Sequence, residues 1–298
     1  MTIKPFQTLS LLLLLPANLL AQDTDPVHQP KPVKVTLFGE LMPKNNLDGN
    51  AAEFGSLKSG ISLGALVPLA GREQILKIGA TGIYRSYDWE NISPDPFDSA
   101  STHAGLRVNY INLAADHLYW NIFSSVASGL ESGAKFGDSL AWGGGAGLGY
   151  VFNDDLRLGI GIGVQDRLED DLFFYPIPLV NWQIAEAWRL YSSDDLDSGL
   201  SLGWRSSAEL EFDLTAGLDF FQFRLNDTGA FPNGAVFDQR KRIGLGLRWT
   251  VAEDTELRIA VGRFFGQEYE VRAPNGSLLA EYEVESNPYL FAALSFRF

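Results

Sequence analysis

The 298-residue chain contains no cysteine, and only three of its residues are histidines. The lack of cysteine excludes disulfide bridges, thiolate metal sites, cysteine nucleophiles and a lipid anchor carried on a cysteine. Basic residues are also scarce, with 23 lysines and arginines against 37 acidic residues and a formal net charge of -14. Such an acidic chain is poorly suited to binding nucleic acid.

Long apolar runs are missing after residue 21, so any membrane insertion of the remaining chain must use β-strands. Before that point, Lys4 precedes the apolar run LSLLLLLPANLLA. This pattern predicts a secretory signal peptide over residues 1–21, cleaved after Ala21. The alternative is a single membrane anchor, which the run is too short to favour. Residues 22–32, QDTDPVHQPKP, are rich in proline and predict a flexible periplasmic leader.

From Val33 onward, apolar and polar residues alternate in segments of roughly ten residues, the period of a β-strand. Strands are expected at 33–41, 57–67, 75–85, 105–114, 118–130, 140–152, 156–165, 177–185, 187–192, 199–205, 210–223, 240–251, 256–266 and 288–298. Short connections such as NDDL and AEDT alternate with long ones such as QDRLEDDLFFYPIP and GQEYEVRAPNGSLLAEYEVES.

This arrangement is typical of an all-β, transmembrane, antiparallel up-and-down β-barrel with short periplasmic turns and long extracellular loops. The sequence therefore predicts one barrel domain over residues 33–298 with about 14 strands. A barrel of 12 strands, in which 187–205 is an extended loop, is the alternative.

The final segment, NPYLFAALSFRF, places Leu290, Leu294, Phe296 and Phe298 on one apolar face. This pattern resembles the carboxy-terminal signature of bacterial outer-membrane β-barrel proteins. The resemblance implies recognition by the barrel-assembly machinery and insertion among outer-membrane lipid and lipopolysaccharide. The segment GVQDRLEDDLFFYPIPLVNWQIAEAWRL is further similar to a family of outer-membrane barrels known as domain of unknown function 6268, which implies no activity.

The polar faces of three neighbouring strands carry opposite charges. The inward positions are expected to hold Glu211, Asp213 and Asp219 on the first strand, Arg242 and Arg248 on the second, and Arg258 on the third. The spacing from Asp213 to Asp219 equals that from Arg242 to Arg248, so an antiparallel register that matches one acid with one arginine matches both. Two lumenal ion pairs, Asp213–Arg248 and Asp219–Arg242, are therefore predicted, either to brace the wall or to select ions.

Motifs for catalysis or cofactor binding are weak. Ser201 lies in GLSLG, but no helix follows to form a nucleophile elbow. Ser101 lies two residues from His103, too close for an ordinary charge-relay arrangement on one strand. The acidic runs DRLEDD and SSDDLDSG could bind calcium, although they lack an EF-hand pattern, and solvated loop charge is the alternative. We predict no catalytic residue, no metal site and no cofactor.

The functional prediction is a passive pore or small-solute transporter of the outer membrane, with the solute undefined. The alternatives are a structural or surface-binding barrel without transport and, more remotely, an outer-membrane hydrolase. The inward-facing positions are richer in basic than in acidic residues, so a mild anion preference is expected if the pore conducts.

Overall fold

The computed structural model describes residues 31–47, 52–69, 73–92, 95–97, 100–115, 117–193 and 199–298. The expected signal peptide, 1–21, and nearly all of the expected leader, 22–32, lie outside the described residues. Within those ranges, no helix is long and apolar enough to cross a membrane.

The described residues form fifteen strands and the short 3-10 helix η2 (Phe136–Ser139). The strands are β1 (Val33–Asn46), β2 (Glu53–Pro68), β3 (Gln74–Glu90), β4 (Ala100–Ala115), β5 (Leu118–Glu131), β6 (Leu140–Asn153), β7 (Leu156–Arg167), β8 (Asp170–Ala185), β9 (Trp188–Ser193), β10 (Gly199–Arg205), β11 (Leu210–Arg224), β12 (Ala235–Ala252), β13 (Thr255–Arg272), β14 (Leu278–Val284) and β15 (Asn287–Arg297).

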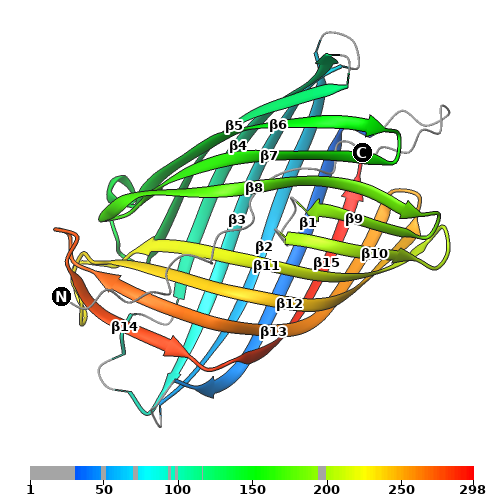
Figure 1. Ribbon diagram of the computed structural model, residues 1–298. Helices are drawn as coiled ribbons and strands as arrows, with labels where there is room; N and C mark the ends of the chain where they lie inside the picture. The colour runs from blue at the N-terminus through cyan, green and yellow to red at the C-terminus, as the bar shows by residue number, and fades with distance from the viewer. Residues whose placement is uncertain are drawn as a thin grey trace, which may run out of the picture.

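The strands close into an antiparallel barrel (Figure 1). Each strand pairs with its neighbour in sequence from β1 to β13, β13 then pairs with β15, and β15 pairs with β1 through contacts such as Leu37 with Leu294. Within the described chain, β14 forms a ladder with β13 alone and extends it as a hairpin. Removing β14 from the fifteen strands leaves fourteen in the ring, which confirms the predicted fold.

The sequence pattern predicted all fourteen ring strands, but two connections differ from expectation. The alternative of 12 strands is wrong, because 187–205 contains β9 and β10. The segment 165–178 was expected to be a long loop, yet β7 and β8 run through it with a tight turn at 168–169. The expected loop at 267–287 contains the end of β13 and all of β14.

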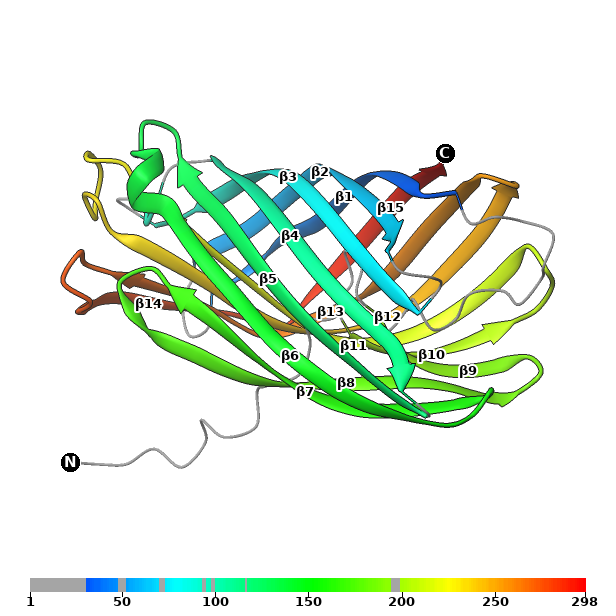
Figure 2. The same cartoon turned by 90° about the horizontal axis from the view of Figure 1, so that it is seen from above.

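The two rims of the barrel differ. The short-turn rim holds the brief connections near 154–155, 186–187, 206–209 and 253–254, together with the paired ends of β1 and β15. The long-loop rim holds the extended hairpin of β13 and β14, the segment 225–234 and η2. Seen from above, these lie at the opposite end of the strands from residue 298 (Figure 2).

Large apolar side chains cover the outside of the barrel, including Leu106, Leu148, Ile160 and Leu245 at 57%, 57%, 67% and 63% exposure. Exposed aromatic rings collect at the short-turn ends of the strands. They are Tyr150, Phe152, Trp182, Trp188, Trp204 and Trp249. An apolar band edged by an aromatic girdle is the surface that a barrel presents to lipid.

The barrel interior is pinched near the long-loop rim, where β5 and β11 touch although five other strands separate them in the ring. Leu130 and Arg224 form a parallel bridge. A Cβ atom on Gly129 would lie 2.2 Å from the carbonyl oxygen of Gln222, so only glycine permits this approach. The contact narrows the interior at this rim, between the inner faces of β1–β4 and those of β6–β8.

Candidate functional site

On one side of the pinch, charged side chains form a buried group that we call the charged cluster: Glu40, Lys58, Arg85, Asp219, Asp238, Arg240 and Arg242. Lys58 Nζ lies 2.9 Å from Glu40 Oε2, and Arg240 Nη2 lies 3.1 Å from Asp219 Oδ2. Arg240 of β12 also donates to Glu40 of β1, and two strands of the ring, β13 and β15, lie between them. Glu40 therefore contacts two cations, and so does Asp219, whose second partner is Arg242 at 3.5 Å. These contacts compensate the cost of removing the charges from water.

The second half of the charged cluster is the ion pair of Arg85 with Asp238, both 0% exposed. Gln267 Nε2 donates to Asp238 Oδ1 at 2.9 Å. Aromatic faces cover the guanidinium groups: Arg85 lies 4.1 Å from the Phe221 ring centroid, and Arg240 lies 3.8 Å from that of Phe264. Cation–π contacts of this kind stabilise a desolvated cation.

Gln267 points inward because of a bulge in β13. The register shifts by one extra residue between the pairs Gln239–Glu268 and Lys241–Phe265. Gly266 lies in this shift with φ +55°, a left-handed conformation that glycine adopts without strain. As a result, Phe264 and Gln267, although separated by three positions, both face the interior and both contact the charged cluster.

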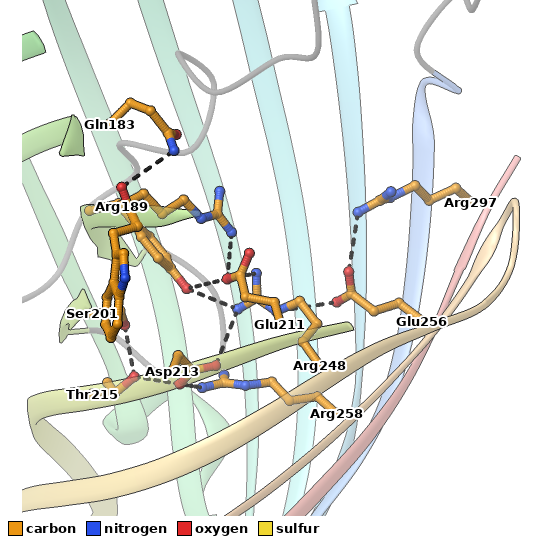
Figure 3. A network of polar contacts seen from close by, with 12 residues as sticks. Gln183, Arg189, Ser201, Glu211, Asp213, Thr215, Arg248, Glu256, Arg258 and Arg297 are labelled. Carbon is orange, nitrogen blue, oxygen red and sulfur yellow. Dashed lines mark hydrogen bonds and ion pairs between the residues drawn. The ribbon is translucent and has the colours of Figure 1, made fainter. Parts of the chain in front are cut away.

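A second network lies closer to the short-turn rim (Figure 3). Glu211 Oε1 accepts from Arg189 at 2.8 Å and from the Tyr191 hydroxyl at 3.4 Å. Asp213 Oδ1 accepts from Arg258 Nη2 at 3.1 Å and from the Thr215 hydroxyl at 2.8 Å. We call this group, with Arg248, the lower network.

The structure places the predicted ion-pair residues on the inner face of β11–β13. The register of β11 with β12 differs by two residues from the one that would put Asp213 opposite Arg248 and Asp219 opposite Arg242. Glu211 is opposite Arg248, and Asp219 is opposite Arg240. The expected partners are diagonal neighbours: Arg248 Nη2 lies 4.0 Å from Asp213 Oδ2, and Arg242 Nη1 lies 3.5 Å from Asp219 Oδ1.

The residue directly opposite Asp213 is Gly246. A Cβ atom there would come within 2.7 Å of the Asp213 carboxylate, so the glycine leaves space for that group. Arg258 makes the closest ionic contact of Asp213, and this contact joins β13 to β11 across β12. The sequence spacing identified the inward residues but not this preference for Arg258.

The inner face of β5–β8 is built differently, and we call it the glycine–aromatic wall. Rings from β5 and β8 lie against glycines of β6 and β7. A Cβ atom on Gly149 would lie 2.1 Å from the Tyr119 ring, one on Gly145 2.4 Å from the Phe123 ring, and one on Gly163 2.3 Å from the Tyr175 ring. The glycine runs thus accommodate rings from neighbouring strands.

The serine motifs do not form catalytic sites. Ser201 lies in β10, where its hydroxyl contacts that of Thr215 at 2.7 Å. Ser101 Oγ lies 3.0 Å from His103 Nε2 and 2.9 Å from the Tyr87 hydroxyl, but Ser101 is only 1% exposed. His103 lies against the rings of Phe221 and Phe223, so this serine–histidine contact offers a substrate no access.

No group of three or more histidine or acidic residues could hold a metal ion within the part of the chain that the structure describes. The run DRLEDD instead contributes ion pairs at the long-loop rim, where Arg167 contacts Asp170 at 2.6 Å and Arg224 contacts Glu169 at 2.6 Å.

The four residues of the expected assembly signal lie on β15 and at its end. Leu290 pairs with Leu41, Leu294 with Leu37 and Phe296 with Val35 of β1. Leu290 and Phe298 are exposed at 46% and 65%, while the alternate residues Tyr289, Phe291 and Ser295 are buried inside.

No family model matches the chain, and no curated protein matches it. Among solved structures, an outer membrane channel from Pseudomonas putida F1 is similar, with a TM-score of 0.51 and 9% identity over 93% of this chain and 99% of that chain. The toluene transporter TodX of P. putida matches with a TM-score of 0.44 and 12% identity, covering 95% of this chain and 92% of that one. The translocator domain of the autotransporter NalP from Neisseria meningitidis matches with a TM-score of 0.38 and 12% identity, covering 91% and 90%.

The first of these similarities establishes a common fold, that of an outer-membrane β-barrel. Membership of the family named domain of unknown function 6268 remains a prediction.

Proposed function

We propose that the protein is a passive outer-membrane pore for small solutes, with a mild preference for anions. The observation that carries this proposal is the partly exposed basic lining of the interior outside the buried clusters. Lys77, Arg107 and Arg157 occupy inward positions of β3, β4 and β7 and are half-buried. Cationic side chains along a confined wall favour anions over cations.

The outer surface supports location in the outer membrane, with the short-turn rim in the periplasm. The aromatic girdle at that rim matches the interface position of such residues in outer-membrane barrels. Residues 1–21 then direct export, and the outward face of β15 is the part that the barrel-assembly machinery recognises. Lipid and lipopolysaccharide are the partners of the outer surface.

Conductance in planar bilayers tests the pore. We expect ion-conducting steps whose reversal potential in a salt gradient shows preference for chloride over potassium. The combined substitution Arg107→Gln and Arg157→Gln should bring the permeability ratio toward one, because it removes lining charge. Lys44→Gln is the matched control, since Lys44 contacts Asp88 and Glu90 at the end of the strands near the long-loop rim. Cation preference in the unmodified protein would contradict the proposal.

A non-conducting structural barrel is the second candidate, and the complete burial of Arg85 and Arg240 favours it. Packed side chains fill the interior around these residues, which leaves less cross-section for solute. A correctly folded barrel that gives no conductance at all would support this candidate against the pore.

Assembly is tested separately. Deleting Phe298, or replacing it by Asp, should reduce the amount of protein inserted in the outer membrane, while Leu279→Asp, on the β14 hairpin, should not. Normal insertion of the Phe298 variants would refute the role of this residue in recognition.

A further inference from the structure

The wall between β8 and β11 is closed in two different ways along its height. Near the short-turn rim the strands β9 and β10, of six and seven residues, fill the space and pair with Asn181–Ala185 of β8 and with 211–217 of β11. Above them, among the described residues, residues 170–180 of β8 have a strand ladder only with β7. On the same side, residues 218–223 of β11 have a ladder only with β12.

The sequence of β8 is adapted to an unpaired edge. The amide of Val180 donates to Ser192 Oγ at 3.0 Å, and that hydroxyl donates to the carbonyl of Pro178 at 2.8 Å. Backbone groups of even-numbered residues in this part of β8 therefore point toward β9 and the unpaired edge. Pro176 and Pro178 occupy two of these positions and carry no N–H, so they remove donors that would lack a ladder partner facing lipid.

We call the boundary between residues 173–178 of β8 and 218–222 of β11 the seam. Side chains close it. The Phe173 ring of β8 stacks on Phe220 of β11 with centroids 6.3 Å apart, and Phe220 lies 6.1 Å from Phe237. The tip of the β7–β8 hairpin is fastened to β11 by Gln222, whose Nε2 donates to the carbonyl of Asp166 at 2.9 Å and whose Oε1 accepts from the amide of Leu168 at 3.0 Å. Such contacts can separate without breaking a strand ladder.

Apolar surface lies on both sides of the seam. Inside, the buried side chains of Phe123, Tyr175, Ile177 and Leu179 belong to the glycine–aromatic wall and its neighbours. On the lipid side of β6–β8, a groove of about 620 Å³ is lined by residues that include Ile160, Phe174 and Pro176. Gly161 and Tyr175 also line this groove, although they belong to inward positions.

We propose that the seam between residues 173–178 of β8 and 218–222 of β11 is a lateral portal through which small apolar, aromatic-sized molecules pass between the glycine–aromatic wall and the lipid. This inference rests on the proposed function, because it needs a barrel through which solutes move. It assigns separate routes to two classes of solute: ions pass along the basic lining, and apolar solutes leave sideways through the seam.

The absence of cysteine makes a direct test possible. The pair Phe173→Cys and Phe220→Cys can be joined across the seam by a disulfide or a short thiol cross-linker. The control pair, Ser201→Cys and Thr215→Cys, joins β10 to β11 where strand pairing already closes the wall and the two hydroxyls are 2.7 Å apart. Entry of the apolar dye N-phenyl-1-naphthylamine into intact Gram-negative cells reports the apolar route, and planar-bilayer conductance reports the ionic route.

Cross-linking the seam should lower the rate of dye entry at least fivefold, with recovery after reduction, and should leave ion conductance unchanged. The control cross-link should alter neither. Gln222→Leu, which removes the two hydrogen bonds between Gln222 and the hairpin tip, should raise the rate of dye entry. Unchanged dye entry with the seam locked, or with Gln222→Leu, would overturn the portal. Loss of both routes together would also overturn it, whereas a missing conductance in the unmodified protein would count against the pore itself.

Discussion

On the inner face of β1–β3 and β11–β13, cations and carboxylates fill the barrel by neutralising one another, whereas on the inner face of β5–β8 aromatic rings lie over glycines. The charged cluster includes electrostatic pairing between strands that are not neighbours in the ring, such as β3 and β12. The glycine–aromatic wall depends on shape and on strands that are adjacent or next but one in the ring. The comparison shows that one barrel can use polar and apolar interiors side by side.

The largest effect is expected from removing the cation shared by two carboxylates. Arg240→Ala leaves Glu40 and Asp219 buried with less positive charge, so it should cost about 3–5 kcal/mol of barrel stability. The unfolding temperature on a heat-modifiability gel measures the loss. Arg205→Ala is the control, because Arg205 is exposed at the short-turn rim. Equal stability of the two variants would show that the charged cluster does not support the fold.

A smaller effect is expected in the glycine–aromatic wall. Gly149→Ala forces the Tyr119 ring aside and should cost about 1–3 kcal/mol, as overpacked cores do. Gly64→Ala is the control, since the nearest atom to its Cβ would lie 4.0 Å away. Gly149→Ala should cost less stability in a Tyr119→Ala background than in the unmodified protein, because the ring that the new methyl group displaces is then absent. If Gly64→Ala is as harmful as Gly149→Ala, the rings do not determine the glycine positions.

Double-mutant cycles test which arginine of the lower network interacts more strongly with Asp213. Asp213→Asn should couple to Arg258→Gln more strongly than to Arg248→Gln, because the ionic distances are 3.1 and 4.0 Å. Coupling energies between contacting residues are typically about 0.5–3 kcal/mol. Urea unfolding of the three single and two double variants measures them. Strictly additive effects in both cycles would show that Asp213 interacts with neither arginine.

The smallest effect concerns the hairpin of β13 and β14 beyond the ring, where Glu268 is opposite Glu283 and Glu270 is opposite Glu281. Burial, a hydrogen bond with Glu281 and the neighbouring carboxylates raise the pKa of Glu268 from 4.5 to about 7. Because the folded pKa lies above the unfolded one, the hairpin is most stable below pH 4.5 and loses stability as the pH rises through about 7.

Hydrogen-exchange protection factors of β14 should therefore be lower at pH 8 than at pH 5. The difference should be about 1 kcal/mol or less, because solvent screens a partly exposed carboxylate. Glu268→Gln should reduce the difference, and Glu285→Gln, outside the facing pairs, should preserve it. If β14 were better protected at pH 8 than at pH 5, repulsion between the facing carboxylates would be excluded as a cause of the pH dependence.

Alternation of apolar residues was sufficient to locate the ring strands, because an outward position facing lipid and an inward position near water differ in every strand. β8 begins at Asp170, well before the expected start at 177, and Pro176 lies within it because proline is compatible with the unpaired edge of this strand. The contact of Arg85 with Asp238 was missed because periodicity gives the face of each residue and not which strands meet across the interior. Asp238 also fell in an expected loop before residue 240.

The pairing of Lys34 with Arg297 joins two strands that are separated by almost the whole described chain, so its consequence concerns the time course of folding. Contacts between such distant residues are slow to form, because a long loop loses entropy before any ladder bond compensates for it. Until β1 meets β15, both strands have a free edge that can join another molecule. The duration of this open stage, rather than the stability of the finished ring, then sets how much protein aggregates before it reaches the membrane.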